Sequence, residues 1–329
     1  MKNAKRQRKL ITVLITVLIS AFVLTSCGGN PSADGVITIG IISIMEHPAL
    51  EDARNGFINS IEAQGFEVEF DYHNALGDVA TMTTIAQRFV NNNVDLILAI
   101  GTGAAQAAAA ATQDRQDIPI VGTAITDYVA AGLVESNERP GFNITGASDF
   151  KPIEAQVAMI GEFVPDIRTL GILFNSSEAN SVVQAEVARQ FAAELGWEYD
   201  ILTVVGPGDV QQVTVTSANR VDAIYIPTDN TFATAMPVVA QVSLDTGTPV
   251  FAAEANMVLT GGVATLSFSY YDLGHESGDM AGMILRGEAT PAELPIRWST
   301  NFFYIVNGYM AEALGITVPE RYVDYIQWP

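Results

Sequence analysis

Three short apolar segments of this 329-residue chain recur in the same order at a nearly constant distance along the sequence. The matching pairs are Thr38–Ile41 and Thr169–Ile172, Val94–Ile97 and Val221–Ile224, and Pro119–Val121 and Pro249–Phe251. The offsets within these pairs are 131, 127 and 130 residues. Because each segment has the apolar composition of a buried strand, the repeat predicts two similar lobes, each built on its own sheet. One long doubly wound sheet is the alternative.

The segments between these strands have the spacing of helices that bury one face. The strand candidates of the first lobe are Val36–Ile44, Phe66–Tyr72, Val94–Ile100 and Ile118–Gly122. Apolar residues at helical spacing between them are Leu50, Ala53, Phe57 and Ile61, and then Met82, Ile85, Ala86, Phe89 and Val90. Strands that alternate with helices pair in parallel through right-handed crossovers. The expected fold class is therefore α/β, with two similar doubly wound parallel-sheet lobes joined by a hinge.

The first 27 residues have the pattern of a secretory signal peptide. Five Lys and Arg residues lie between positions 2 and 9, and an apolar run from Leu10 to Leu24 follows. This run has 15 residues, whereas a membrane-spanning helix needs about 20. The only cysteine, Cys27, ends the sequence LTSC directly after this run, which resembles a bacterial lipobox. We expect Cys27 to carry a lipid and residues 28–35 to form a flexible tether. An ordinary signal with an unrelated cysteine is the alternative.

The charge balance argues against a nucleic-acid-binding protein. The full chain has a net charge of -21, and loss of the five signal cations would bring it to -26. Nucleic-acid binding depends on clustered cations, and Lys151 is the only lysine after the signal. With a single cysteine, no internal disulfide is possible. We expect an acidic monomer with no nucleic-acid partner, held at the membrane by its lipid and not by surface charge.

Polar side chains gather directly after the predicted strands, where open parallel sheets bind their ligands. In the first lobe they are Met45 (apolar), Glu46, His47, Asn74, Thr102, Gly103, Thr126 and Asp127. In the second lobe they are Asn175, Glu178, Asp229, Asn230 and Glu254. These segments contain almost no Lys or Arg, which argues against a phosphate-bearing ligand.

This set of residues fits a ligand that carries one negative and one positive charge. Thr102 and Gly103 open an alanine-rich helix, and the free N–H groups of a helix N-terminus bind a carboxylate. Asp229 and Glu254, from the other lobe, would neutralise an ammonium group, although Asp229 is equally explained as a helix N-cap. The predicted ligand is a zwitterionic amino acid. An apolar and aromatic wall for its side chain would comprise Met45, His47, Tyr128, Tyr270 and Tyr271.

No set of residues in the sequence is typical of an enzyme. Gly101–Gly103 is a weak match to a dinucleotide fingerprint, because Gln106 replaces its last glycine. His275-Glu276 begins like a zinc-protease helix, but Asp279 stands where the second histidine belongs. We expect no catalytic activity, no cofactor and no metal; an extracytoplasmic hydrolase would need a nucleophile that the sequence does not offer.

Taken in order, the motifs at the strand ends resemble one family. They are Ile39–Ile41 (IGI), Glu46–Leu50 (EHPAL), Asn74-Ala75, Ala104–Ala108 (AAQAA), Thr126-Asp127, Asn143–Gly146 (NITG), Asn175–Glu178 (NSSE), Tyr225–Asn230 (YIPTDN) and Tyr270–Gly274 (YYDLG). From about Ile37 to Pro319, the chain is similar to the ABC transporter substrate-binding lipoproteins of the tryptophan/tyrosine-binding type.

The resemblance implies a type I periplasmic-binding-protein fold, in which the chain crosses between the lobes three times. The first lobe would comprise residues 36–148 and about 270–295, and the second residues 149–269 and about 296–329, ending in a helix. Residues 1–27 are the signal peptide and 28–35 the tether.

The resemblance also implies a binding protein, on the extracytoplasmic face of the membrane, that delivers an aromatic amino acid to ABC permease and ATPase subunits. In the site predicted on this basis, Thr102, Gly103 and Thr126 hold the carboxylate and Asp229 and Glu254 hold the amine. Asn175, Glu178 and Asn230 complete the network. A sensing lipoprotein without transport and a binder of another small solute, such as a nucleoside, are the alternatives.

Overall fold

A computed structural model of the chain describes residues 36–329. The predicted signal peptide, its Cys27 and the tether at 28–35 lie outside the described residues. None of the helices between residues 36 and 329 has the length and hydropathy that a bilayer crossing requires.

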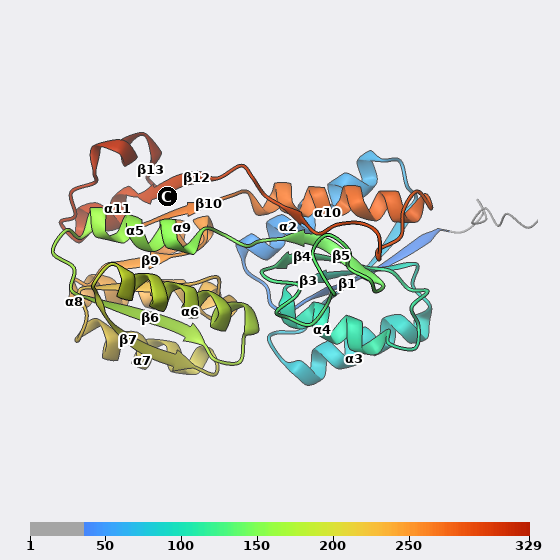
Figure 1. Cartoon of the computed structure of the whole chain (residues 1–329), viewed down its shortest axis with the longest axis horizontal. Helices are drawn as coiled ribbons and strands as arrows, with labels where there is room; N and C mark the ends of the chain where they lie inside the picture. The colour runs from blue at the N-terminus through green and yellow to red at the C-terminus, as the bar shows by residue number, and fades with distance from the viewer. Residues whose placement is uncertain (1–35) are drawn as a thin grey trace, which may run out of the picture. The chain divides into compact units, whose positions relative to one another are not determined.

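The first lobe is built on a six-stranded parallel sheet in the order β11-β5-β4-β3-β1-β2. Its strands are β1 (Ile37–Ser43), β2 (Val68–Asn74), β3 (Leu96–Ile100), β4 (Ile120–Ile125), β5 (Ile144–Ser148) and β11 (Arg297–Trp298). Its helices are α2 (Pro48–Ala63), α3 (Val79–Asn92), α4 (Thr102–Ala111) and α10 (Tyr270–Leu285). Helices α2 and α10 cover one face of the sheet and α3 and α4 cover the other (Figure 1).

The second lobe repeats the first four strands in the same spatial order. Strand order β2-β1-β3-β4 in the first lobe corresponds to β7-β6-β8-β9 in the second, and all these pairs are parallel. The strands are β6 (Thr169–Asn175), β7 (Glu198–Val204), β8 (Ala223–Ile226) and β9 (Val250–Ala252). The helices are α5 (Ile153–Phe163), α6 (Ala179–Glu194), α7 (Val210–Ala218), α8 (Asn230–Thr246) and α9 (Ala255–Thr260), with the 3-10 turn η1 (Pro207–Asp209). The prediction of two similar parallel-sheet lobes is confirmed.

The repeated Val-Asp segments have the same structural role in each lobe. The backbone N–H of Thr38 donates to Asp95 Oδ2 at 2.8 Å, and that of Thr169 donates to Asp222 Oδ2 at 2.8 Å. Each aspartate therefore binds the start of the central strand beside it. The apolar residues predicted to face the core, among them Phe57 and Phe89, are buried.

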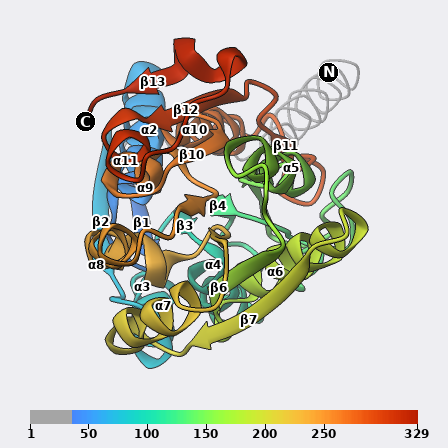
Figure 2. The same ribbon diagram turned by 90° about the vertical axis from the view of Figure 1, so that its left-hand side faces the viewer.

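A small second sheet, in the order β10-β12-β13, departs from the predicted all-parallel pattern. Strands β10 (Ala264–Ser267) and β12 (Phe303–Asn307) are antiparallel, and β13 (Ile326–Gln327) pairs with β12 in parallel. These strands lie on the opposite side of the second lobe from β7 (Figures 1 and 2). The remaining elements are α11 (Gly308–Ala313) and the 3-10 helix η2 (Glu320–Tyr325), so the last element is a strand and not the expected helix.

The chain passes between the lobes after β5, after β10 and after β11. Because β11 pairs with β5, the third crossing begins after Trp298 and not near residue 296 as expected. Aromatic rings join the crossings: Phe150 contacts Trp298 with centroids 6.1 Å apart, and Phe268 contacts Phe302 at 6.0 Å.

The second crossing returns the chain to the first lobe through helix α10, which packs along α2. Two glycines permit this close approach. A Cβ at Gly56 would lie 2.0 Å from the Tyr271 carbonyl oxygen, and one at Gly274 would lie 1.8 Å from that of Ala53. Backbone thus packs on backbone between segments more than 200 residues apart in the sequence.

Candidate functional site

The carboxyl ends of the two parallel sheets meet at the boundary between the lobes. His47 Nε2, from the loop before α2, lies 3.1 Å from Asn230 Oδ1 at the start of α8. Gln184 Nε2, from α6, donates to Thr126 Oγ1, after β4, at 3.2 Å. The residues predicted from the strand ends therefore come together from both lobes.

Glu178 organises the second-lobe side of this boundary. Its Oε2 accepts from the Asn230 backbone N–H at 2.9 Å and from Asn230 Nδ2 at 2.6 Å. Its Oε1 accepts from the N–H of Thr231 at 3.0 Å and from its hydroxyl at 2.8 Å. Because Asn230 Nδ2 donates to Glu178, Oδ1 is the acceptor toward His47, so His47 donates from Nε2. Both Glu178 and Asn230 are buried, as is Asn175, which donates to Thr231.

Asp229 is fully buried, and backbone N–H groups bind both its oxygens. Asn175 N donates to Oδ2 at 2.6 Å and Phe232 N donates to Oδ1 at 2.9 Å. Burial, together with the neighbouring Glu178 carboxylate, raises the pKa of Asp229 to about 8, while these two donors oppose the shift. Asp229 thus caps α8 and holds the end of β6, as in the alternative considered from the sequence. Its contact with a ligand ammonium stays a prediction.

Two buried polar atoms, one on each lobe, have no hydrogen-bond partner: Thr102 Oγ1 and Glu254 Oε2. Thr102 is the first residue of α4, and its side chain is 3% exposed. The N-cap of this helix, Gly101, offers no side-chain bond, so the first N–H groups of α4 have no cap.

Glu254 follows β9, is 1% exposed, and makes no cap bond to α9. Burial raises the pKa of its carboxyl group, while the nearby charges of His47 and Lys151 act in the opposite direction. An unpartnered buried carboxyl group carries a desolvation cost that a cationic ligand would remove.

A cavity of about 360 Å³ lies between the lobes, within the usual size range of small-molecule sites. Its first-lobe lining is largely apolar and includes Met45 and Met82, whereas its second-lobe lining is mostly polar. Of the predicted site residues, it is lined by Met45, Gly103, Asn175 and Glu178.

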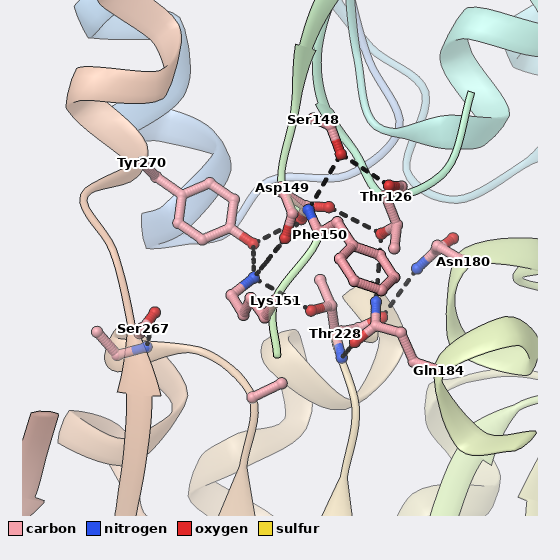
Figure 3. Close-up of polar contacts among 12 residues, drawn as sticks. Thr126, Ser148, Asp149, Phe150, Lys151, Asn180, Gln184, Thr228, Ser267 and Tyr270 are labelled. Carbon is pink, nitrogen blue, oxygen red and sulfur yellow. Dashed lines mark hydrogen bonds and ion pairs between the residues drawn. The ribbon is translucent and has the colours of Figure 1, made fainter. Parts of the chain in front are cut away.

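A second polar cluster, at the chain crossings, was missed in the sequence analysis (Figure 3). At its centre Lys151 is fully buried, and Nζ lies 2.9 Å from the Tyr270 hydroxyl. Tyr270 in turn donates to Asp149 Oδ2 at 2.7 Å, and Thr126 donates to Asp149 Oδ1 at 2.8 Å. The predicted residues Thr126 and Tyr270 thus belong to this cluster. The signal for it was the single lysine after residue 27, followed by no other.

Two predicted residues lie at the outer rim of the first lobe. Glu46 is exposed and accepts from Asn74 Nδ2 at 3.4 Å, with Arg54 at 3.8 Å. Asp127 binds the backbone N–H groups of Val129 and Ala130, which close its own turn.

Two tyrosines of the predicted wall lie away from the cavity. Tyr128 is fully buried in the first-lobe core, where its hydroxyl donates to the Ala147 carbonyl oxygen at 3.3 Å. The hydroxyl of Tyr271 accepts from Asn59 between α10 and α2. Their assignment to the wall was wrong, because core packing and helix packing take up both side chains.

Two parallel-sheet lobes that share three chain crossings and meet at their strand ends define a type I periplasmic binding protein. Residues 38–326 match the family described as ABC transporter substrate binding protein. The chain belongs to this family, whose members bind small ligands outside the cytoplasm and work with permease and ATPase subunits.

Similar proteins include the tyrosine-binding protein of Clostridioides difficile, 32% identical over 94% of this chain and 93% of that protein. The crystal structure of an ABC domain from Streptococcus pneumonia in complex with L-Trp is 32% identical, with a TM-score of 0.85 over 89% of this chain and 100% of that one. A ligand-free, open substrate binding protein from Clostridium difficile, 36% identical, has a TM-score of 0.68 over 89% of this chain and 99% of that one. The lobes described here are thus arranged more as in the L-Trp complex than as in the open structure.

Proposed function

We propose that this protein binds a zwitterionic amino acid with an aromatic side chain between its lobes and delivers it to an ABC importer. The observation that carries the proposal is the pair of unpartnered buried groups, Thr102 Oγ1 on one lobe and Glu254 Oε2 on the other. A carboxylate at the N-terminus of α4 would accept from Thr102 and from the first N–H groups of the helix. An ammonium group would compensate Glu254.

The choice of an aromatic side chain is supported by the cavity and by the relatives. Gly103, the second residue of α4, lines the cavity, so a ligand bound at this helix end would extend into it. Met45 and Met82 contribute polarisable thioethers to its lining, which make favourable contacts with aromatic rings. The ligands that two relatives' names give, tyrosine and L-Trp, are both aromatic amino acids.

Binding of this kind needs lobes that move relative to one another. We assign residues 36–148 and about 270–298 to the first lobe, and 149–269 and about 299–329 to the second. A ligand whose two charged groups contact different lobes is fully bound only when the lobes are together, so it favours that arrangement.

Isothermal titration calorimetry with L-tryptophan and two analogues tests the charge assignment. Indole-3-propionate lacks the ammonium group and tryptamine lacks the carboxylate. Each analogue should bind at least about 100-fold more weakly than L-tryptophan, because each leaves one buried group unpartnered. Tryptamine binding as tightly as L-tryptophan would contradict the carboxylate site. A nucleoside that binds where no amino acid does would contradict the proposed ligand class.

We further propose that Cys27 carries a lipid that holds the protein at the extracytoplasmic face of the membrane. The support is the sequence pattern of residues 1–27. A Cys27→Ala variant should move from the membrane fraction to the soluble fraction. An unchanged distribution between these fractions would contradict the anchor.

A further inference from the structure

The chain crossings hold a buried lysine that the proposed ligand contacts do not use. Lys151 lies between β5 and α5, and its side chain is fully buried. Its Nζ lies 3.1 Å from the Asp149 carbonyl oxygen, 2.9 Å from the Tyr270 hydroxyl and 3.3 Å from Thr228 Oγ1 (Figure 3). A lysine ammonium has three protons, so these three acceptors satisfy it.

The three acceptors come from different parts of the molecule. Tyr270 is the first residue of α10, which packs on the first lobe, whereas Thr228 follows β8 of the second lobe. Asp149 lies in the crossing itself, two residues before Lys151. A single ammonium group therefore bonds to both lobes at once.

The surroundings of Lys151 exclude water from the ammonium group. Nζ lies 4.7 Å from the ring centroid of Phe268 and 4.9 Å from that of Tyr270, both in the second crossing. Such cation–π contacts stabilise a desolvated cation, and Asp149 Oδ2, 3.8 Å from Nζ, supplies the opposite charge. A buried ammonium that loses one of its acceptors carries a large desolvation cost.

Thr228 also connects this cluster to the first lobe through α6. Its backbone N–H donates to Gln184 Oε1 at 3.1 Å, and Gln184 Nε2 donates to Thr126 Oγ1 at 3.2 Å. If the lobes separate by rotation at the crossings, the bonds from Lys151 to Thr228 and from Gln184 to Thr126 lengthen together. These contacts form without any ligand.

We propose that Lys151 is a positioning residue that favours the closed arrangement, in which both lobes contact it, and thereby raises ligand affinity. The affinity effect rests on the proposed function, whereas the conformational effect does not. Since the apparent Kd equals the intrinsic Kd divided by the fraction of competent protein, a larger closed fraction binds more tightly. Lys151 acts through the arrangement of the lobes and does not touch the ligand.

A pair of variants at Thr228 tests this proposal without removing the charge. Thr228→Val removes the acceptor hydroxyl at nearly constant volume, and Thr228→Ser keeps the hydroxyl. Hydrogen-exchange mass spectrometry of the ligand-free, full-length protein would follow the first turns of α4 and α6, which contact each other across the lobes. Exchange there should be faster in Thr228→Val and unchanged in Thr228→Ser.

Calorimetry with L-tryptophan supplies the second measurement. Loss of one hydrogen bond to a charged group should weaken the affinity of Thr228→Val by about five-fold or more, with Thr228→Ser close to wild type. Lys151→Met should have a larger effect of the same sign, if it folds.

Exchange and affinity of Thr228→Val that equal those of wild type would overturn the proposal. So would equal changes in both Thr228 variants, because these would reflect packing and not the hydroxyl. If no protein, wild type included, binds any amino acid, the proposed function fails, while the exchange measurement still decides the role of Lys151.

Discussion

The helix that follows the third strand differs between the two lobes in one respect. In the second lobe Asp229 fills the N-terminus of α8, because its carboxyl group accepts from Phe232 N at 2.9 Å. In the first lobe the equivalent position is Gly101, which has no side chain, and the N-terminus of α4 has no cap. The same backbone scaffold thus gives a self-satisfied helix end in one lobe and one open to a ligand in the other.

The acidic groups of the second lobe divide in the same way. Glu178 and Asp229 bind backbone N–H groups with both oxygens, whereas Glu254 Oε2 has no partner. Buried polar groups that are satisfied within the protein hold its structure, and an unsatisfied one marks a place where a ligand gains most. The comparison therefore separates structural from recognition residues among side chains of the same type.

The largest effect on affinity is expected from Glu254→Gln. Loss of the carboxylate leaves the buried ammonium of the ligand unpaired, which costs about 2–5 kcal/mol, or some 30-fold or more in Kd. The same change should raise the melting temperature of the ligand-free protein, because an unpaired buried carboxyl group is removed. Calorimetry and thermal unfolding measure the two effects. Unchanged affinity for L-tryptophan would remove Glu254 from the site.

Asp229→Ala should act on stability. Two buried N–H groups, of Asn175 and Phe232, lose their acceptors, so the free energy of unfolding should fall by about 2–4 kcal/mol in urea titrations. Asp78→Ala, which removes the exposed N-cap of α3, is the matched control and should cost about 1 kcal/mol. A large loss of affinity with unchanged stability would instead support the predicted contact between Asp229 and the ligand.

The pH dependence of binding should distinguish Glu254 from its satisfied neighbours. Its pKa in the ligand-free protein is raised above the ordinary 4.5, because burial disfavours the charged form. Since an ammonium ligand needs the carboxylate, affinity should fall as the pH drops through the raised pKa. Ionisation opposes folding, so wild type should also lose stability relative to Glu254→Gln as the pH rises from 4.5 through that pKa. Parallel pH profiles for the two proteins would show that another group titrates.

The smallest effect is expected from Thr102→Val. The N–H groups of α4 remain, and only one hydroxyl donor to the carboxylate is lost, so Kd should rise by about five-fold. Thr102→Ser keeps the hydroxyl and should bind L-tryptophan like wild type. Equal loss of affinity in both variants would indicate an effect of shape.

The fold was predictable because its signals are local and repeated. The offset between Thr38 and Thr169, and the helical spacing that includes Phe57 and Phe89, each reflect a periodicity that a short window of sequence contains. The small antiparallel sheet was missed because β12 pairs with β10, which lies more than 30 residues earlier, on the other side of an entire first-lobe helix.

The candidate site was predictable in its location but not in its hydrogen-bond partners. Residue type and position after a strand identified both Asp229 and Glu254, but the partner of Asp229 is the backbone of Asn175, 54 residues away. Tyr128 shows the same limit. It occupies room left by Gly122 and Gly146, where an added Cβ would lie 2.6 and 2.5 Å from its hydroxyl oxygen. Neither glycine is near Tyr128 in a short window of sequence.

The packing of α10 on α2 also determines the order in which the molecule can be completed. A chain that emerges with its N-terminus first exposes the apolar face of α2 until residues 270–285 arrive, and it lacks the edge strand β11 until residue 298. The whole of the second parallel sheet emerges before that point. The lobe that begins first is thus completed late, and an aggregation-prone interval is built into the synthesis of this protein.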